Sequence, residues 1–139
     1  MHPKILIIAT TPYSTSDSSR TLDAYFHYWE KHRVSQIFTR NWIPNKGHCG
    51  EMYQITDASL LKRWLHKPVE VGKIYKYDEM RNEDGNEVIE DNSVVSLSYK
   101  IGERHSPVVE IFRGILWRKK FWCTSKLIEW LDNYKPECI

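Results

Sequence analysis

The chain has 139 residues, a formal net charge of +2, 41% hydrophobic residues and 27% charged residues. This length and composition indicate one globular domain with a sizeable core, and they exclude a disordered or low-complexity chain. The small net charge argues against a dedicated nucleic-acid-binding protein. Three cysteines without a Cys-x-x-Cys motif argue against a disulfide framework, and no apolar run fits a signal peptide or a membrane span. We therefore expect a cytoplasmic protein with reduced thiols.

The first forty residues predict a strand, a loop, a helix and a second strand. Residues 4–10 read as an apolar strand, and a hydroxyl-rich loop follows. The helix is expected to begin near residues 16–19, with an apolar face made by Leu22, Tyr25, Phe26 and Trp29. A second strand over Val34–Thr39 completes an order that is typical of a parallel sheet. The Ile and Leu run at Ile5–Ala9 suits a central strand covered on both faces.

The rest of the chain predicts further helices around a middle segment that is hard to interpret. A short strand over Met52–Ile55 precedes a helix capped by Thr56 or Asp57. We expect its buried stripe to contain Leu60, Leu61, Trp64 and Leu65. Residues 73–102 show only a turn pattern at residues 82–86 and a strand-like alternation at Val94–Tyr99.

Two more helices are expected near the C-terminus. One begins at Ser106-Pro107, because proline suits the first turn of a helix. The other spans Ser125–Tyr134 and is expected to bury Leu127, Ile128 and Leu131. Together the predicted elements indicate an α/β fold, namely a Rossmann-like three-layer α/β/α domain with a mainly parallel sheet.

The loop after the first strand is the strongest candidate for a ligand site. In open α/β sheets, ligands bind outside the carboxyl ends of the strands, where helix N-termini offer free N–H groups. The hydroxyls of this loop also suit turn and cap hydrogen bonds, and Arg20 suits either an anion or solvent. The expected site consists of Thr11, Ser14, Thr15, Ser16, Asp17, Arg20 and Arg40. Since the motif Gly-x-Gly-x-x-Gly is missing from this loop, a dinucleotide cofactor is disfavoured.

Two other segments call for an interpretation. His48 and Cys49 are adjacent, but no second ligand pair has the spacing of a metal site, so we expect no metal. The segment Arg113–Trp122 mixes basic and aromatic residues. Such a segment is typical of a membrane-surface helix, and also of a core helix with basic residues in its last turn. We favour the core helix.

Several segments, taken in order, resemble the N-terminal domain of GT-B glycosyltransferases, most closely glycosyltransferase family four. Lys4–Thr10 resembles the first strand, and Ser14–Leu22 resembles the loop and first helix of a bacterial subgroup. Gln36–Thr39 with Asn41 and Pro44, and then Tyr53–Asp57, are similar to the second strand and a later loop. Lys126–Leu131 and Lys135–Ile139 resemble the helix and the Lys-Pro-Asp-x-Ile strand that follow, with Glu137 in place of the usual Asp.

The resemblance implies that residues 1–139 are the acceptor-side domain of a two-domain enzyme and a fragment of a longer protein. Such an enzyme transfers a sugar from a nucleotide-sugar to an acceptor hydroxyl. The donor binds the C-terminal domain, so this domain holds no cofactor, and the chain alone is expected to be inactive. No catalytic residue is assigned, because relatives carry a catalytic His or Asp in a loop beyond Ile139.

The implied partners are a sugar, glycan or lipid-linked acceptor and the C-terminal domain of the same protein, with no nucleic acid. Peripheral contact with the inner face of the membrane and self-association of the fragment are left open. The alternative is a free-standing Rossmann-like nucleotide- or carbohydrate-binding module without catalysis.

Overall fold

The computed structural model describes residues 2–13, 20–81 and 107–139. The strands are β1 (Ile5–Ala9), β2 (Val34–Phe38), β3 (Glu51–Gln54) and β4 (Lys73–Lys76). The helices are α1 (Arg20–Phe26), α2 (Asp57–Trp64), α4 (Pro107–Leu116), α5 (Lys119–Trp122) and α6 (Ser125–Tyr134). Two short 3-10 helices are η2 (Lys31–Arg33) and η3 (Tyr77–Glu79). The strand-like alternation expected at Val94–Tyr99 lies outside the described residues.

The four strands form one sheet in the order β1-β2-β3-β4. β1 pairs with β2 in parallel, and β2 pairs with β3 in parallel, whereas β4 is antiparallel to β3. The predicted α/β fold with a mainly parallel sheet is therefore confirmed. β4 lies at the start of the middle segment, where the sequence pattern predicts no strand.

β1 does not lie in the middle of the described sheet, contrary to expectation. β2 lies on one side of it, and on the other side Ile5 forms an isolated parallel bridge with Cys138. The Leu6 N–H donates a 2.9 Å hydrogen bond to the Cys138 carbonyl. The segment Lys135–Ile139, which resembles a strand in sequence, thus lies beside β1 and pairs with it through a single bridge.

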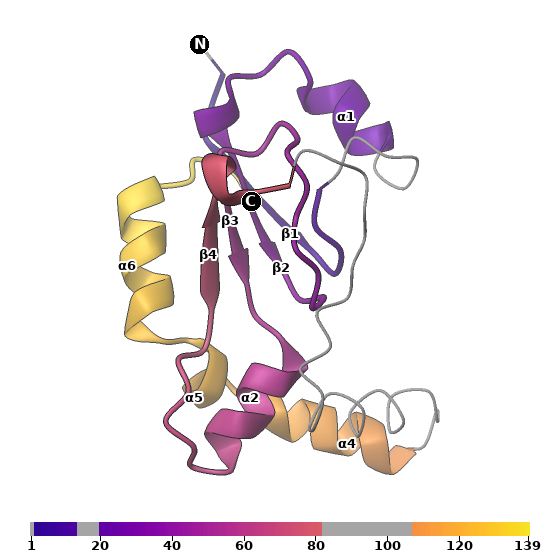
Figure 1. Ribbon diagram of the computed structural model, residues 1–139, viewed down its shortest axis with the longest axis vertical. Coiled ribbons are helices and arrows are strands. Elements are labelled where there is room, and N and C mark those ends of the chain that lie inside the picture. Colours follow the sequence, from indigo (N-terminus) through magenta and orange to yellow (C-terminus); the bar gives the residue numbers. More distant parts are fainter. Residues whose placement is uncertain (1, 14–19, 82–106) are drawn as a thin grey trace.

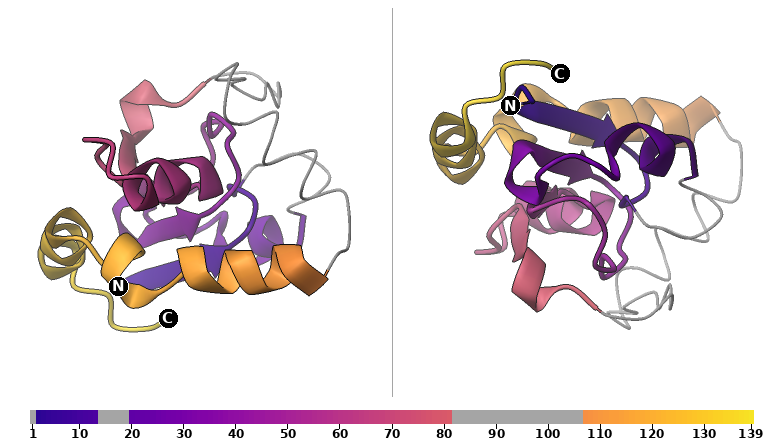
Figure 2. Two further views of the ribbon diagram at one scale, coloured as in Figure 1. Left: turned by 90° about the horizontal axis from the view of Figure 1, so that it is seen from below. Right: turned by 90° about the horizontal axis from the view of Figure 1, so that it is seen from above.

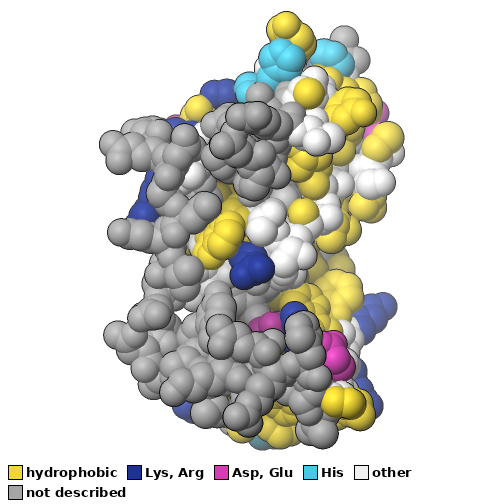
Figure 3. All heavy atoms as spheres, turned by 90° about the vertical axis from the view of Figure 1, so that its right-hand side faces the viewer, with side chains coloured by type: hydrophobic (Ala, Val, Ile, Leu, Met, Phe, Trp, Pro, Cys, Tyr) yellow, Lys and Arg dark blue, Asp and Glu magenta, His cyan; other side chains and the backbone are white. Residues whose placement is uncertain are grey.

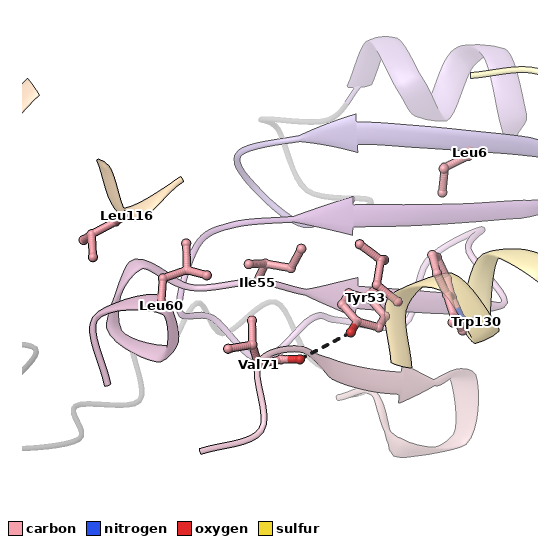
Figure 4. Packing of buried hydrophobic residues seen from close by; sticks show 8 residues of the cluster. Leu6, Tyr53, Ile55, Leu60, Val71, Leu116 and Trp130 are labelled. Atoms are coloured by element: carbon pink, nitrogen blue, oxygen red, sulfur yellow. Dashed lines mark hydrogen bonds between the residues drawn. The ribbon is translucent and has the colours of Figure 1, made fainter. Parts of the chain in front are cut away.

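The two faces of the sheet are covered differently (Figures 1 and 2). α6 and α5 lie over one face, here called the helix-covered face, and α2 and α4 extend its core beyond the carboxyl ends of the strands. Figure 4 shows this core, which consists of Leu6, Tyr53, Ile55, Leu60, Val71, Leu116, Leu127 and Trp130. The opposite, loop-covered face buries Tyr13, Val34, Phe38, Cys49, Met52, Tyr75 and Met80 under α1 and the loops.

Local sequence signals explain where α2 and α6 begin. The Thr56 hydroxyl caps α2 by accepting from the Ser59 N–H, and Thr124 caps α6 in the same way through the Leu127 N–H.

The apolar stripes of α2 and α6 are narrower than predicted. Leu60 is fully buried on α2, but the exposed fractions of Trp64 and Leu65 are 40% and 49%. On α6, Trp130 is buried and Ile128 is exposed, because α6 turns a different edge of its apolar stripe toward the sheet.

Candidate functional site

The described part of the predicted site lies at the carboxyl ends of β1 and β2. Thr11 follows β1 and Arg40 follows β2, and because these strands are parallel, both residues reach the same edge of the sheet. Ser14, Thr15, Ser16 and Asp17 lie outside the described residues, and so does the side chain of Arg20. Of the seven predicted residues, the two with described side chains, Thr11 and Arg40, both lie at this edge.

The described part of helix α1, Arg20–Phe26, lies beside the amino ends of the strands in Figure 1. Leu22 and Phe26 pack there against the loop-covered face, whereas Tyr25 is exposed. The start of this helix, which is expected near residues 16–19, lies outside the described residues, so its contribution to the site stays a prediction.

Backbone hydrogen bonds join the loops that follow β1 and β2. The Thr10 carbonyl accepts from the Arg40 N–H at 2.9 Å and from the Thr39 N–H at 3.2 Å. At the next strand, the Ile55 N–H donates to the Phe38 carbonyl at 2.9 Å. The exits of the first two strands are thus bonded directly to one another.

A buried glutamine in the centre of β2 holds the loop after β1. Gln36 is fully buried, and its Oε1 accepts from the Tyr13 N–H at 2.5 Å. Its Nε2 donates to the Thr11 carbonyl at 3.0 Å. One side chain therefore satisfies two backbone groups of a loop that has no strand partner, which keeps Thr11 and Tyr13 close to the sheet.

A second glutamine, at the end of β3, holds the loop after β2. The Gln54 Nε2 donates to the Arg40 carbonyl at 2.7 Å and to the Trp42 carbonyl at 3.1 Å. Its Oε1 accepts from the Tyr75 hydroxyl at 3.3 Å. Tyr75, on β4, therefore fixes the orientation of the amide that bonds to the loop.

At this edge, the side chains of Arg40 and Trp42 lie next to each other and can contact a ligand. The Arg40 guanidinium lies 5.5 Å from the centroid of the Trp42 ring, within the range of a cation–π contact. It forms no ion pair with a carboxylate of the described residues. An exposed arginine beside an indole ring provides a positive charge and an apolar ring face, both of which suit a polar organic ligand.

Two buried polar atoms of the loop between β2 and β3 have no hydrogen-bond partner among the described residues. They are the Trp42 Nε1 donor and the Asn45 Oδ1 acceptor. Each unsatisfied buried group destabilises a fold by about 1–3 kcal/mol. Unsatisfied buried polar groups are common at functional sites. The NMR signal of the Trp42 indole N–H should therefore respond to changes in this loop.

The N-terminus of α2 lies beyond the carboxyl end of β3 and is already occupied by the chain's own groups. Asp57 lies in its first turn. The Asp57 Oδ1 accepts from the Trp117 Nε1 at 2.7 Å, and its Oδ2 lies 3.4 Å from the Arg113 Nη2. These contacts join α2 to α4. They place Arg113 and Trp117 in the helix packing, as expected for a core helix.

Neither metal binding nor membrane spanning is indicated within residues 2–13, 20–81 and 107–139. No three His, Cys, Asp or Glu side chains in those ranges are placed together as metal ligands. Cys49 is fully buried in the loop-covered face, and burial raises the pKa of its thiol well above the usual range. The helices of the same ranges are all too short or too polar to cross a bilayer.

A second surface lies toward the amino ends of the strands. In Figure 3, histidine and hydrophobic side chains gather on this surface, at the top of the molecule. His2 stacks on Trp29 with ring centroids 4.5 Å apart, and the His27 ring lies 6.4 Å from that of His48. Thr11 and Arg40 follow the carboxyl ends of the parallel strands β1 and β2. This surface lies at the amino ends and is therefore separate from the edge that holds those two residues.

Sequence reasoning did not assign a role to Gln36, Gln54 or Trp42. A usable signal was present in the strand predicted over Val34–Thr39, where a glutamine interrupts an apolar segment. A buried amide must find hydrogen-bond partners, so a polar residue inside such a strand indicates a nearby backbone that needs them. The pattern does not say which backbone that is.

Comparison of the chain with protein-family models, with curated proteins and with solved structures gives no significant match. The fold and the geometry of this edge are therefore the basis for the function proposed below.

Proposed function

We propose that this domain is the acceptor-binding half of a nucleotide-sugar-dependent glycosyltransferase of the GT-B type. The observation that carries the proposal is the joined pair of loops at the carboxyl edge, where Thr11 and Arg40 lie on adjacent strand exits. This edge is where open α/β sheets bind their ligands. The ordered resemblance to glycosyltransferase family four, from Lys4 to Ile139, supports the same assignment.

The proposed role is to hold an acceptor hydroxyl in position. The Thr11 side chain offers a hydroxyl, and Arg40 offers donors that bind sugar oxygens or a phosphate on a lipid-linked acceptor. The sugar donor binds a second domain, and closure between the two domains brings the reacting atoms together. The resemblance covers the acceptor side alone, so this chain by itself is expected to transfer no sugar.

A titration followed by NMR tests the proposal. The ¹⁵N-labelled chain is titrated with methyl glycosides of glucose, mannose, galactose and N-acetylglucosamine, and separately with UDP-glucose, GDP-mannose and ADP-glucose. We expect a glycoside to shift the amides of Thr11 and Arg40 and the indole of Trp42. Arg40→Ala should weaken this binding about tenfold, the effect of one lost charged hydrogen bond.

The matched control is Arg118→Ala, an exposed arginine at the start of α5, which packs on the helix-covered face. This variant should bind the glycoside as the wild type does. Shifts confined to the amino-end surface, or none with any glycoside, would contradict the proposal. Micromolar binding of a nucleotide-sugar to this chain would instead favour the free-standing nucleotide-binding module.

A further inference from the structure

We propose that Gln36 and Gln54 are positioning residues that together hold the two loops of the carboxyl edge in the arrangement that binds ligand. The inference deepens the proposed function and rests on it for the identity of the ligand. It concerns side chains that contact no ligand themselves. Their effect is transmitted through the backbone of residues 11–13 and 40–42.

The first reason is where these amides point. Both glutamines lie on the loop-covered face, on neighbouring strands, and both are buried. Burying an amide without partners is unfavourable by about 1–3 kcal/mol in proteins, so an apolar residue would suit this face better if only packing mattered. The four hydrogen bonds described above from these amides to backbone atoms all reach the loops that follow β1 and β2.

The second reason is that the contacts form a continuous chain. Gln36 bonds to Thr11 and Tyr13, and the neighbouring Thr10 carbonyl accepts from the N–H groups of Thr39 and Arg40. The Arg40 carbonyl in turn accepts from Gln54, which Tyr75 orients. Because each loop is bonded to the other, we expect the loss of either glutamine to displace both loops.

The chemistry of Gln36 provides a sharp test. A protonated carboxyl has one carbonyl acceptor and one O–H donor, so Gln36→Glu in its neutral form can replace both bonds. An ionised carboxylate has no donor for the Thr11 carbonyl. Burial raises the pKa of such a carboxyl, since the charged form loses its hydration. The variant should therefore hold the loop at low pH and release it as pH rises through that pKa.

The experiment follows the Tyr13 amide and the Trp42 indole by NMR between about pH 5 and pH 9. In Gln36→Glu, both signals should be wild-type-like at the acid end and move together as pH rises, and glycoside binding should weaken about tenfold over the same range. Gln36→Met, similar in length but without hydrogen bonds, should show displaced signals throughout. The amide of Leu127, on the other face, reports in each case that the fold is intact.

Gln54→Glu is the matched control for the mechanism. The Gln54 amide donates to two carbonyls, whereas a protonated carboxyl has one proton, so acid should restore only one of the two bonds. Partial recovery at low pH in Gln54→Glu, beside full recovery in Gln36→Glu, supports positioning by specific hydrogen bonds.

Three results would overturn the inference. One is wild-type loop signals in Gln36→Met. Another is the same pH response in Gln36→Glu and wild type, which decides the question even if Gln36→Met fails to fold. The third is displaced loops with unchanged glycoside affinity. If the loops respond as expected but the wild type binds no glycoside, the proposed function fails, and the holding of the loops by the glutamines stands.

Discussion

The two faces of the sheet use different chemistry to cover the same strands. On the helix-covered face, aromatic and aliphatic side chains from α2, α4 and α6 fill the core, and the polar atoms of Tyr53 and Trp130 are satisfied at its margin. On the loop-covered face, Gln36 and Gln54 bond directly to loop backbone. The first arrangement buries apolar area under the helices, whereas the second uses hydrogen bonds to hold the loops after β1 and β2 in place. We infer that global stability depends mainly on the helix-covered face, and the geometry of the edge site on the other.

Trp130→Ala should have the largest effect on stability. Trp130 is buried between Tyr53 and Tyr134, and its Nε1 donates to Glu51 at 2.9 Å. Truncation should lower the free energy of unfolding by about 3–5 kcal/mol, measured by urea denaturation. Trp64→Ala, on an exposed position of α2, is the control and should lower it by about 1 kcal/mol. Equal losses would contradict the central role of Trp130 in the core of the helix-covered face.

Two glycine substitutions should have opposite signs. Gly72 has a φ of +97°, and a Cβ there would lie 2.1 Å from the Tyr53 hydroxyl. Gly72→Ala should therefore destabilise the domain by about 2–4 kcal/mol. Gly114 lies in α4, and no atom of the described residues lies within 4 Å of an added Cβ. Gly114→Ala should stabilise by about 0.5–1 kcal/mol, and thermal denaturation of both variants checks the contrast.

Labelling of Cys49 compares the faces directly. Cys49 is buried under the loop-covered face, and its raised thiol pKa further slows alkylation. We expect iodoacetamide to reach it through local opening, at a lower free energy than global unfolding, because loops held by few hydrogen bonds open first. Cys138 is exposed and should react at once. Labelling of Cys49 only at the global unfolding rate would show that both faces open together.

The smallest effect is expected at the amino end, from His2 and Glu30. The His2 Nδ1 lies 3.0 Å from the Glu30 Oε2, and this hydrogen bond lowers the pKa of the Glu30 carboxyl. A lowered folded-state pKa gives stability that is present above the unfolded value and is lost as pH falls through the folded one. Because the pair is exposed, the change in stability should be slight. In His2→Ala, NMR titration should return the Glu30 pKa toward its usual value, while an unchanged value would contradict the assigned cause.

Residue patterns alone determined the fold class and several elements. The strands at Ile5–Ala9 and Val34–Phe38 were predicted within one residue at each end, and the last helix was predicted over the same residues, Ser125–Tyr134. The helix start at Pro107 was also predicted, and Thr56 was one of the two caps expected for α2. These features succeed because hydrophobic period, capping and proline geometry act over a few neighbouring residues.

Tertiary structure decided the rest, because burial depends on what packs against a side chain. Periodicity marked Trp64 and Ile128 as apolar-face residues, yet no neighbouring element covers them fully. β4 was not predicted, since its four residues become a strand by pairing with β3. The carboxyl edge was expected from the order of strands, and Thr11 and Arg40 reach it. The glutamines that hold its loops bond to residues 12 to 25 positions away in the chain, a separation that no local pattern records.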